Sequence, residues 1–468
     1  MRSVFFIASL VFVIAGWKDS KAQSRPNIIL IIADDLGWND VGCYGNTAVR
    51  TPNIDRLAKD GIRFNNVFVT SSSCSPSRTS IITGRYPHST GAAELHTPLP
   101  ADQTFFPEIL KKNGYYTAQA GKWHEGPHTK RAYDTLITGA KNGVGGEGMW
   151  LSVLKDRPKN KPFFCWFAAF DAHRPWQPDT ALQPHDPSKV IVPPMLADTK
   201  ETREDLAAYY NEIARLDRYV GEINDELQRQ GIAENTIVIF MSDNGRPFPG
   251  NKTRLNDAGV KTPFIIKWPQ SGKKGMECDG LISAVDIAPT LLEIAQAPAV
   301  PVIQGKSFAA LFKDPGQPFR EYVFTEHNWH DYEAYERAVR TRDFLYIFNG
   351  RPQFPNQGPL DAVNSPSFKA LLTAKGKGAL TKLQNDIFLS PRPAEELYDL
   401  GKDGDQANNL ASDSRFAATK KKLSSVLTQW QKETGDTQPA ALTPDWYDRV
   451  TGEKTDKNKV RGEMPGTR

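Results

Sequence analysis

The sequence is short of cysteine, of charge of one sign and of long hydrophobic runs, and each shortage excludes a class of protein. Its 468 residues include only 4 cysteines, too few for a disulfide-stapled scaffold. The formal net charge of +4 is too small to indicate nucleic-acid binding, so we expect no nucleic-acid partner. The composition, 39% hydrophobic and 24% charged, is typical of a globular chain long enough for a large core and a second lobe.

An apolar stretch at the start of the chain indicates a secretory signal. It covers residues 4–17 and precedes Ser20-Lys21-Ala22, whose small residues favour cleavage after Ala22. We predict a signal peptide over residues 1–22 and a secreted or periplasmic protein. An uncleaved anchor is the alternative, although the run is short for the roughly 20 residues of a membrane span. No cysteine follows for a lipid anchor and no later stretch could span a membrane, so we expect no stable membrane anchor.

Three continuous apolar runs, typical of buried parallel strands, each end in polar residues. The runs cover residues 28–32, 163–170 and 236–241. The first is followed by Asp34 and Asp35, the second by Asp171 and His173, and the third by Asp243 and Asn244. In parallel α/β sheets ligands bind at the carboxyl ends of the strands, so we expect these side chains at one edge.

The rest of the pattern predicts a large α/β unit followed by a smaller lobe. Apolar residues at three- and four-residue steps from Leu206 to Leu227 predict a helix. Later segments are typical of antiparallel strands and a terminal amphipathic helix: residues 321–325, 337–348 and 414–434. We predict an N-terminal catalytic domain over residues 23–318 and a C-terminal subdomain over residues 319–468, with a flexible or surface-wrapping tail after Asp448.

The most specific motif is Cys74-Ser75-Pro76-Ser77-Arg78, which continues to Thr83-Gly84-Arg85. Alone, a cysteine beside proline and arginine would be a surface turn with a buried thiol. The whole dodecapeptide resembles the sulfatases, in which this cysteine is oxidised after translation to the catalytic aldehyde, formylglycine. The resemblance implies that Cys74 becomes formylglycine (3-oxoalanine) and that a formylglycine-generating maturation enzyme is a partner of this chain.

The resemblance also assigns roles around Cys74. The hydrated aldehyde attacks sulfur with one hydroxyl, and the other later expels sulfate. Arg78 and Lys122 would hold this diol, and His124, in the family-like Gly121-Lys122-Trp123-His124, would act as base when sulfate is eliminated. His173 and Lys252 would bind sulfate and supply the leaving-group proton.

A metal site is implied by the same resemblance. The ligands would be Asp34, Asp35, Asp243, Asn244 and an oxygen of the formylglycine at position 74. Hard oxygen ligands favour Ca²⁺ or Mg²⁺ over zinc, and one Ca²⁺ is the expected ion. Either acidic segment taken alone would equally be an ordinary turn at the end of a strand.

The resemblance extends from Pro26 to about Asn409 and implies an alkaline-phosphatase-like fold. That fold has a large mixed sheet sandwiched by helices and a smaller C-terminal α+β subdomain containing an antiparallel sheet. The match favours the sulfamidase (N-sulfoglucosamine sulfohydrolase)-like and bacterial polysaccharide sulfatase branch. The expected substrate is a sulfated oligosaccharide of heparan, ulvan or carrageenan type, with four candidate contacts: Glu94, His96, His327 and His330.

Two other functions share the fold. A phosphate-ester hydrolase of the alkaline phosphatase superfamily would usually need a second metal with added histidine ligands, and the sequence shows no paired Asp/His set for one. A non-catalytic sulfoglycan-binding homologue would be marked by loss of Cys74, Arg78 or an aspartate, and none is lost. If Cys74 stays a thiol, the chain is an inactive precursor.

Overall fold

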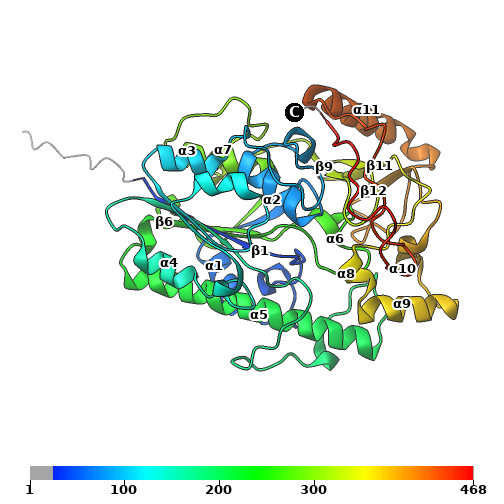
Figure 1. Ribbon diagram of the computed structural model, residues 1–468, viewed down its shortest axis with the longest axis horizontal. Helices are drawn as coiled ribbons and strands as arrows, with labels where there is room; N and C mark the ends of the chain where they lie inside the picture. Colours follow the sequence, from blue (N-terminus) through cyan, green and yellow to red (C-terminus); the bar gives the residue numbers. More distant parts are fainter. Residues whose placement is uncertain (1–24, 467–468) are drawn as a thin grey trace, which may run out of the picture.

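A computed structural model describes residues 25–466, and eight strands in it form one mixed sheet (Figure 1). The predicted signal peptide lies outside the described residues. The strand order is β4-β3-β5-β1-β6-β7-β2-β8. The strands are β1 (Asn27–Ala33), β2 (Ile62–Phe68), β3 (Tyr116–Gly121), β4 (Thr135–Ile137), β5 (Phe163–Ala168), β6 (Thr236–Ser242), β7 (Phe264–Lys267) and β8 (Met276–Ser283).

The centre of the sheet is parallel, as the three apolar runs predict. Strand β1 pairs in parallel with β5 on one side and β6 on the other, and Leu30 lies opposite both Trp166 and Ile239. Every residue of these three strands is buried, which explains why they are continuously apolar and show no alternation. Strand β7 is antiparallel to β6 and β2, which makes the sheet mixed.

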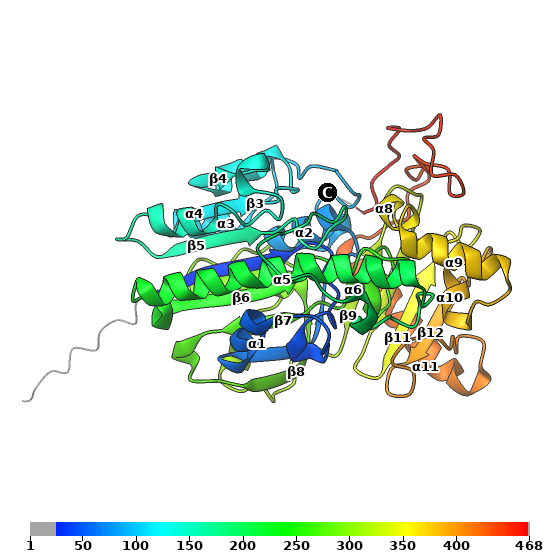
Figure 2. The ribbon, with the colours of Figure 1, turned by 90° about the horizontal axis from the view of Figure 1, so that it is seen from below.

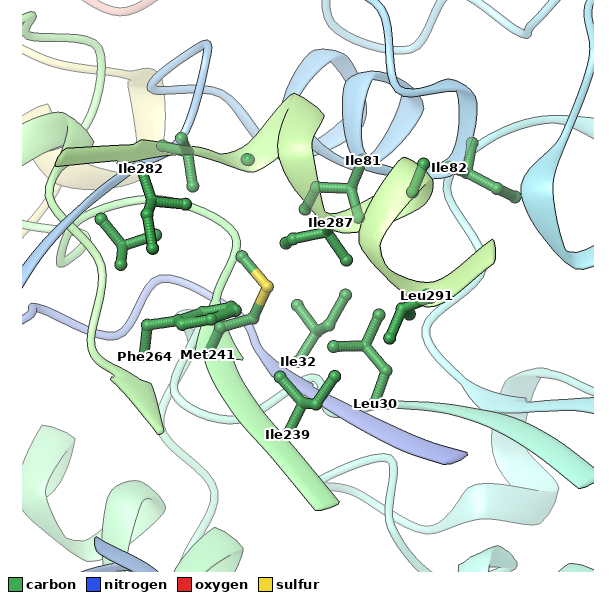
Figure 3. Close-up of a cluster of buried hydrophobic side chains, with 14 of the residues drawn as sticks. Leu30, Ile32, Ile81, Ile82, Ile239, Met241, Phe264, Ile282, Ile287 and Leu291 are labelled. Atoms are coloured by element: carbon green, nitrogen blue, oxygen red, sulfur yellow. The ribbon is translucent and has the colours of Figure 1, made fainter. Parts of the chain in front are cut away.

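Helices cover both faces of the sheet (Figures 1 and 2). On one face α2 (Cys74–Thr83), α3 (Phe106–Lys112) and α7 (Ile287–Ile294) pack on the even-numbered residues of β1. On the other face α1 (Pro52–Lys59), α4 (Trp150–Asp156) and α5 (Lys200–Arg229) pack on its odd-numbered residues. Figure 3 shows Leu30 and Ile32 of β1 directed toward Ile287 and Leu291 of α7.

A second, antiparallel sheet lies in the C-terminal region, with strand order β12-β11-β10-β9. Its strands are β9 (Val323–His327), β10 (Glu336–Arg340), β11 (Phe344–Asn349) and β12 (Glu395–Asp399). The last helix, α11 (Ala417–Thr434), packs on this sheet through Leu423, Leu427 and Trp430. The expected fold class is confirmed, while the domain boundary at residues 318 and 319 stays a prediction.

The remaining α-helices of the described residues are three between β11 and β12 and one short helical turn after β6. Between β11 and β12 lie α8 (Leu360–Val363), α9 (Pro366–Gly376) and α10 (Lys382–Asn385), and α9 packs against α5 of the large unit. The turn α6 (Asp257–Val260) follows β6. The four cysteines, all at described positions, are free thiols. Among residues 25–466, no helix has both the length and the apolar character needed to cross a bilayer.

The central packing predicts the effect of a cavity under α2 and α7. Replacing Ile239 of β6, which is 1% exposed, by alanine should lower the free energy of unfolding by about 2–5 kcal/mol, because buried contacts are lost and a void remains. Urea unfolding measures this change. Val450→Ala, at a side chain 91% exposed, is the control and should change stability by less than about 0.5 kcal/mol. Equal effects of the two substitutions would contradict the packing described.

Candidate active site

Two neighbouring parallel strands bring the predicted acids together. Ala33 at the end of β1 lies opposite Ser242 at the end of β6, so the next residues, Asp34 and Asp243, leave the sheet side by side. The backbone of Asp35 turns into the left-handed region at φ 61°, and its N–H donates to Asp243 Oδ1 at 3.1 Å. All three aspartates are buried, at 0–1% exposure.

Cys74 begins helix α2 directly above these acids. Its side chain is 2% exposed, and its Sγ lies 3.6 Å from Asp35 Oδ1. Burial raises the pKa of the Cys74 thiol well above its usual value, so the unmodified residue is a protonated thiol and a poor nucleophile. Arg78, four residues later on the same helix, faces the same acids because residues at i and i+4 share a helix face.

Each of the three aspartates has a buried cation as its partner. Arg78 Nε donates to Asp243 Oδ2 at 2.7 Å, and Lys252 Nζ donates to Asp35 Oδ2 at 2.8 Å. Lys122, which follows β3, forms a short ion pair with Asp34. Burial acts to raise the pKa of Asp34, but Lys122 and the other nearby cations outweigh it and the pKa is lowered overall. The pKa of Asp243 is raised, because burial outweighs the opposing effect of Arg78.

The oxygens that remain fit a divalent cation. Oδ1 of Asp34 and Oδ1 of Asn244 are buried and accept no hydrogen bond, an arrangement that costs free energy unless another partner binds them. Ligand atoms of Asp34, Cys74 and Asp243 lie within 4.8 Å of one another, and so do those of Asp35, Cys74 and His173. Carboxylate and amide oxygens dominate this set, which suits a hard cation such as Ca²⁺ or Mg²⁺.

The same pocket holds donors that suit an anion. Nη1 and Nη2 of Arg78 are buried without a hydrogen-bond acceptor, and Asp34 Oδ1 lies 3.7 Å from Nη2. Lys122 and Lys252 flank Cys74 closely enough to lower the pKa of its thiol, although burial dominates that shift. A pocket with three cations around the small, buried side chain of Cys74 can bind an oxyanion and stabilise negative charge on it.

Two predicted histidines have different partners around Cys74. His173 follows β5, and its Nε2 lies 3.7 Å from Asp35 Oδ2 and 3.6 Å from Asp361 Oδ2. Its Nδ1 has the carbonyl of the next residue as partner, which orients the ring. His124 Nε2 lies 2.7 Å from His96 Nδ1, and burial followed by Lys122 holds the pKa of His124 well below its usual value.

Asp361, on α8, is a candidate that the sequence did not reveal. It comes from the segment between β11 and β12, far from every motif, and one of its carboxylate oxygens is buried without a hydrogen-bond donor beside His173. No local pattern around it differs from that of an ordinary helix start. The contact between Asp361 and His173 depends on the packing of α9 against α5, which positions α8, so it can be found only from the tertiary structure.

The four predicted sugar contacts fall in different environments. His330 is 5% exposed, and its Nδ1 lies 2.7 Å from Ser73 Oγ. His327 and His330 line a small cavity of about 30 Å³, and burial lowers the pKa of His327 to about 4. His96 is exposed, and its ring lies beside that of His124. Glu94 is buried, and its Oε2 accepts from Thr443 Oγ1 at 2.7 Å and from Arg461 Nη1 at 3.0 Å.

Comparison with known proteins shows that the chain belongs to the sulfatase family. The family model described as sulfatase matches residues 26–144 and 149–297. A second model, described as the C-terminal part of N-sulphoglucosamine sulphohydrolase, matches residues 251–348. These matches cover both the motif at Cys74 and the strand ends that carry the acids.

The relatives confirm two predictions: the chain belongs to the sulfamidase-like branch, and it is of the sulfuric ester hydrolase class. Human N-sulphoglucosamine sulphohydrolase is 31% identical over 90% of this chain and 93% of its own length. An ulvan-active sulfatase of Formosa agariphila is 30% identical over 89% of this chain and 76% of its own length.

Solved structures support the fold. One, described as being in complex with its substrate D-glucosamine-2-N,6-O-disulfate, has a TM-score of 0.68 at 21% identity and covers 87% of this chain and 98% of that one. The phosphonate monoester hydrolase of Agrobacterium radiobacter has a TM-score of 0.64 at 19% identity and covers 87% and 96%. Proteins described with different substrates thus share this architecture, so the fold alone does not select the substrate.

The buried pair of Lys252 and Asp35 predicts a large stability effect. In protein freed of divalent cations, Lys252→Met should lower the free energy of unfolding by about 3–5 kcal/mol, because it leaves a buried carboxylate without its partner. The control is Lys200→Met, which removes an exposed pair with Glu204 at 3.7 Å and should cost less than about 1 kcal/mol. Urea unfolding compares the two, and a Lys252→Met protein as stable as the control would contradict this pairing.

Proposed function

We propose that this protein is a formylglycine-dependent sulfatase that removes sulfate, O- or N-linked, from a sulfated sugar. The observation that carries the proposal is the position of Cys74, buried at the start of α2 between three aspartates and three cations. A modified residue there would present its oxygen to an oxyanion already surrounded by positive charge. The thiol in the structure marks the place of that oxygen.

The metal ligands in this proposal are Asp34, Asp35, Asp243, Asn244 and the modified residue 74. A bound Ca²⁺ would supply positive charge that polarises a sulfate oxygen and favours ionisation of the nucleophile. The two buried oxygens without donors, on Asp34 and Asn244, support this ligand set.

The chain's own side chains divide into two groups around the nucleophile. Arg78 and Lys122 lie on the side of Asp34 and Asp243, where they would hold the nucleophile and sulfate oxygens. His124, with its lowered pKa, would be neutral near pH 7 and could accept a proton there. His173 and Lys252 lie on the side of Asp35, where they would bind sulfate and give a proton to the leaving oxygen or nitrogen.

The substrate class is proposed from relatives and from the pocket together. The relatives are named for N-sulphoglucosamine and for ulvan, both sulfated sugars. Beside the pocket, His330 lies between Ser73 and a cavity that His327 also lines, and Asp361 and His96 lie at other edges. Histidine and carboxylate groups at these positions could bond sugar hydroxyls. We also propose that residues 1–22 are a signal peptide, that the protein is secreted or periplasmic, and that a maturation enzyme converts Cys74 to formylglycine.

The first test is the mass of the peptide that contains Cys74, from protein of the native host or co-expressed with a maturation enzyme. Conversion of the thiol to an aldehyde should lower the mass by about 18 Da. Cys74→Ala should keep the fold and lose turnover of sulfated sugars, because no nucleophile remains. Turnover by Cys74→Ala would refute the mechanism. If the matured protein cleaves phosphate esters or phosphonates but no sulfate, the result would favour a phosphate-ester hydrolase. If it binds sulfoglycans without turnover, the result would favour the inactive homologue.

The metal site has its own test. Asp243→Ala should lose the bound cation and most activity, because it removes a ligand and frees Arg78 from its partner. Elemental analysis after dialysis against Ca²⁺ measures the bound ion per chain. Asp286→Ala is a matched control, since Asp286 is equally buried and paired with Arg320 away from the site, and it should keep the ion. Full metal content in Asp243→Ala would reassign the ligands.

A further inference from the structure

The segment after α11 returns from the C-terminal lobe to the large unit. In Figures 1 and 2 this red segment runs from the smaller lobe back toward the large unit. Asp436 ties its start to Arg337 of β10, with Nε and Oδ2 2.6 Å apart. Near its end, Gly466 lies against His88, so closely that a Cβ added there would be 2.4 Å from the His88 carbonyl oxygen. The segment is therefore packed at both ends.

Arg461 is the residue through which this segment reaches the surroundings of the active site. Its guanidinium lies 4.4 Å from the ring centre of Trp329 and 4.5 Å from that of Trp446. Nη1 donates to Oε2 of the buried Glu94 at 3.0 Å, and Nη2 donates to the carbonyl of Leu95 at 2.7 Å. An arginine that stacks on two rings and pairs with a buried carboxylate is held far more firmly than an exposed one.

The groups that Arg461 holds belong to two separate loops. Glu94 and Leu95 follow α2 in the large unit, whereas Trp329 follows β9 of the smaller sheet. A backbone hydrogen bond from Leu95 N to Trp329 O, at 3.2 Å, joins the loops directly, and Arg461 joins them a second time. Arg461 thus acts as a clamp between residues 94–95 and residue 329.

The next residue of each loop bonds a neighbour of the nucleophile. His96 N donates to Ser75 Oγ at 2.8 Å, and its ring lies 2.7 Å from His124. His330 Nδ1 lies 2.7 Å from Ser73 Oγ. The two serines flank Cys74, so each clamped loop fixes one side of the nucleophile.

We propose that Arg461 is a positioning residue of the sulfatase reaction, a role that rests on the function proposed above. It acts through the two loops: they set His96 and His330, and these set Ser75 and Ser73 on either side of residue 74. Arg461 itself touches no reacting atom. The C-terminal segment is in this way a working part of the active site, and the contacts of Glu94 explain its burial without a sugar.

The test uses matured, metal-loaded full-length protein. Arg461→Ala should lower kcat by about 10–100-fold for a sulfated sugar and for a small aryl sulfate alike, because residue 74 is misplaced for both substrates. The KM of the aryl sulfate, which makes no sugar contact, should change little. Arg461→Lys keeps the charge beside Glu94 and should recover part of the loss. Lys457→Ala removes the same charge from an exposed position of the same segment and should leave kcat unchanged.

A second measurement is independent of activity. Hydrogen exchange followed by mass spectrometry should show faster exchange in Arg461→Ala over residues 94–96 and 328–330, where the Leu95 and His96 amides lose their bonds, and no change in β1 or β6. Trp446→Leu, which removes one of the two stacked rings, should give a smaller effect of the same kind, and it serves if Arg461→Ala does not fold.

The outcomes separate the two proposals. Normal kcat in Arg461→Ala, or a loss seen with the sulfated sugar and not with the aryl sulfate, overturns the positioning role. Unchanged exchange in both loops overturns the clamp. If the matured wild-type protein hydrolyses no sulfate, the proposed function fails, and the exchange data still decide whether Arg461 holds the loops beside residue 74.

Discussion

The structure depends on the neutralisation of negative charge at the ends of two buried strands. Asp34, Asp35 and Asp243 are brought together because β1 and β6 pair in register, and none of them reaches solvent. Three buried carboxylates in one place would be prohibitively costly without partners. The cations come from the segment after β3, from α2 and from further along the segment after β6, so the pairing of charges also determines how these segments meet.

This arrangement links stability to chemistry. Each cation that neutralises an aspartate also faces the pocket around residue 74, and the guanidinium of Arg78 has donors left over for an anion. Asp34 and Asn244 in turn have oxygens left over for a cation. Both the cationic and the anionic members of these pairs therefore have hydrogen-bonding atoms without a partner. This is expected for a preorganised site, whose charged groups are in position before the ligands bind. His124 and His330, whose pKa values burial holds well below the usual range, add hydrogen bonds without adding charge.

The buried parallel strands and the acids at their ends could be predicted from local sequence, whereas the roles of Cys74 and the cations around it could be predicted only through the resemblance of their motifs to a family. Continuous apolar runs marked the parallel strands, and the acids after them marked the edge where they end. Strands β2 and β8 escaped prediction, because β2 has a broken burial pattern and β8 begins with exposed residues. Asp361 and Arg461 escaped for another reason: each acts through a contact between distant segments, and neither lies in a periodic pattern or motif. The sugar contact of Glu94 stays a prediction, and in the structure its carboxylate accepts hydrogen bonds from Thr443 and Arg461.

The burial of Cys74 has a consequence for the time at which the protein can become active. A thiol that is 2% exposed, at the first turn of a fully buried helix, offers no access to a second protein once α2 is packed. If the proposed function holds, a maturation enzyme would have to act while this stretch of chain is still extended. Oxidation and folding would then compete for the same nascent segment, and the ratio of their rates would set the yield of active protein. Chains that fold before oxidation would keep a buried thiol at position 74 and remain correctly folded but inactive.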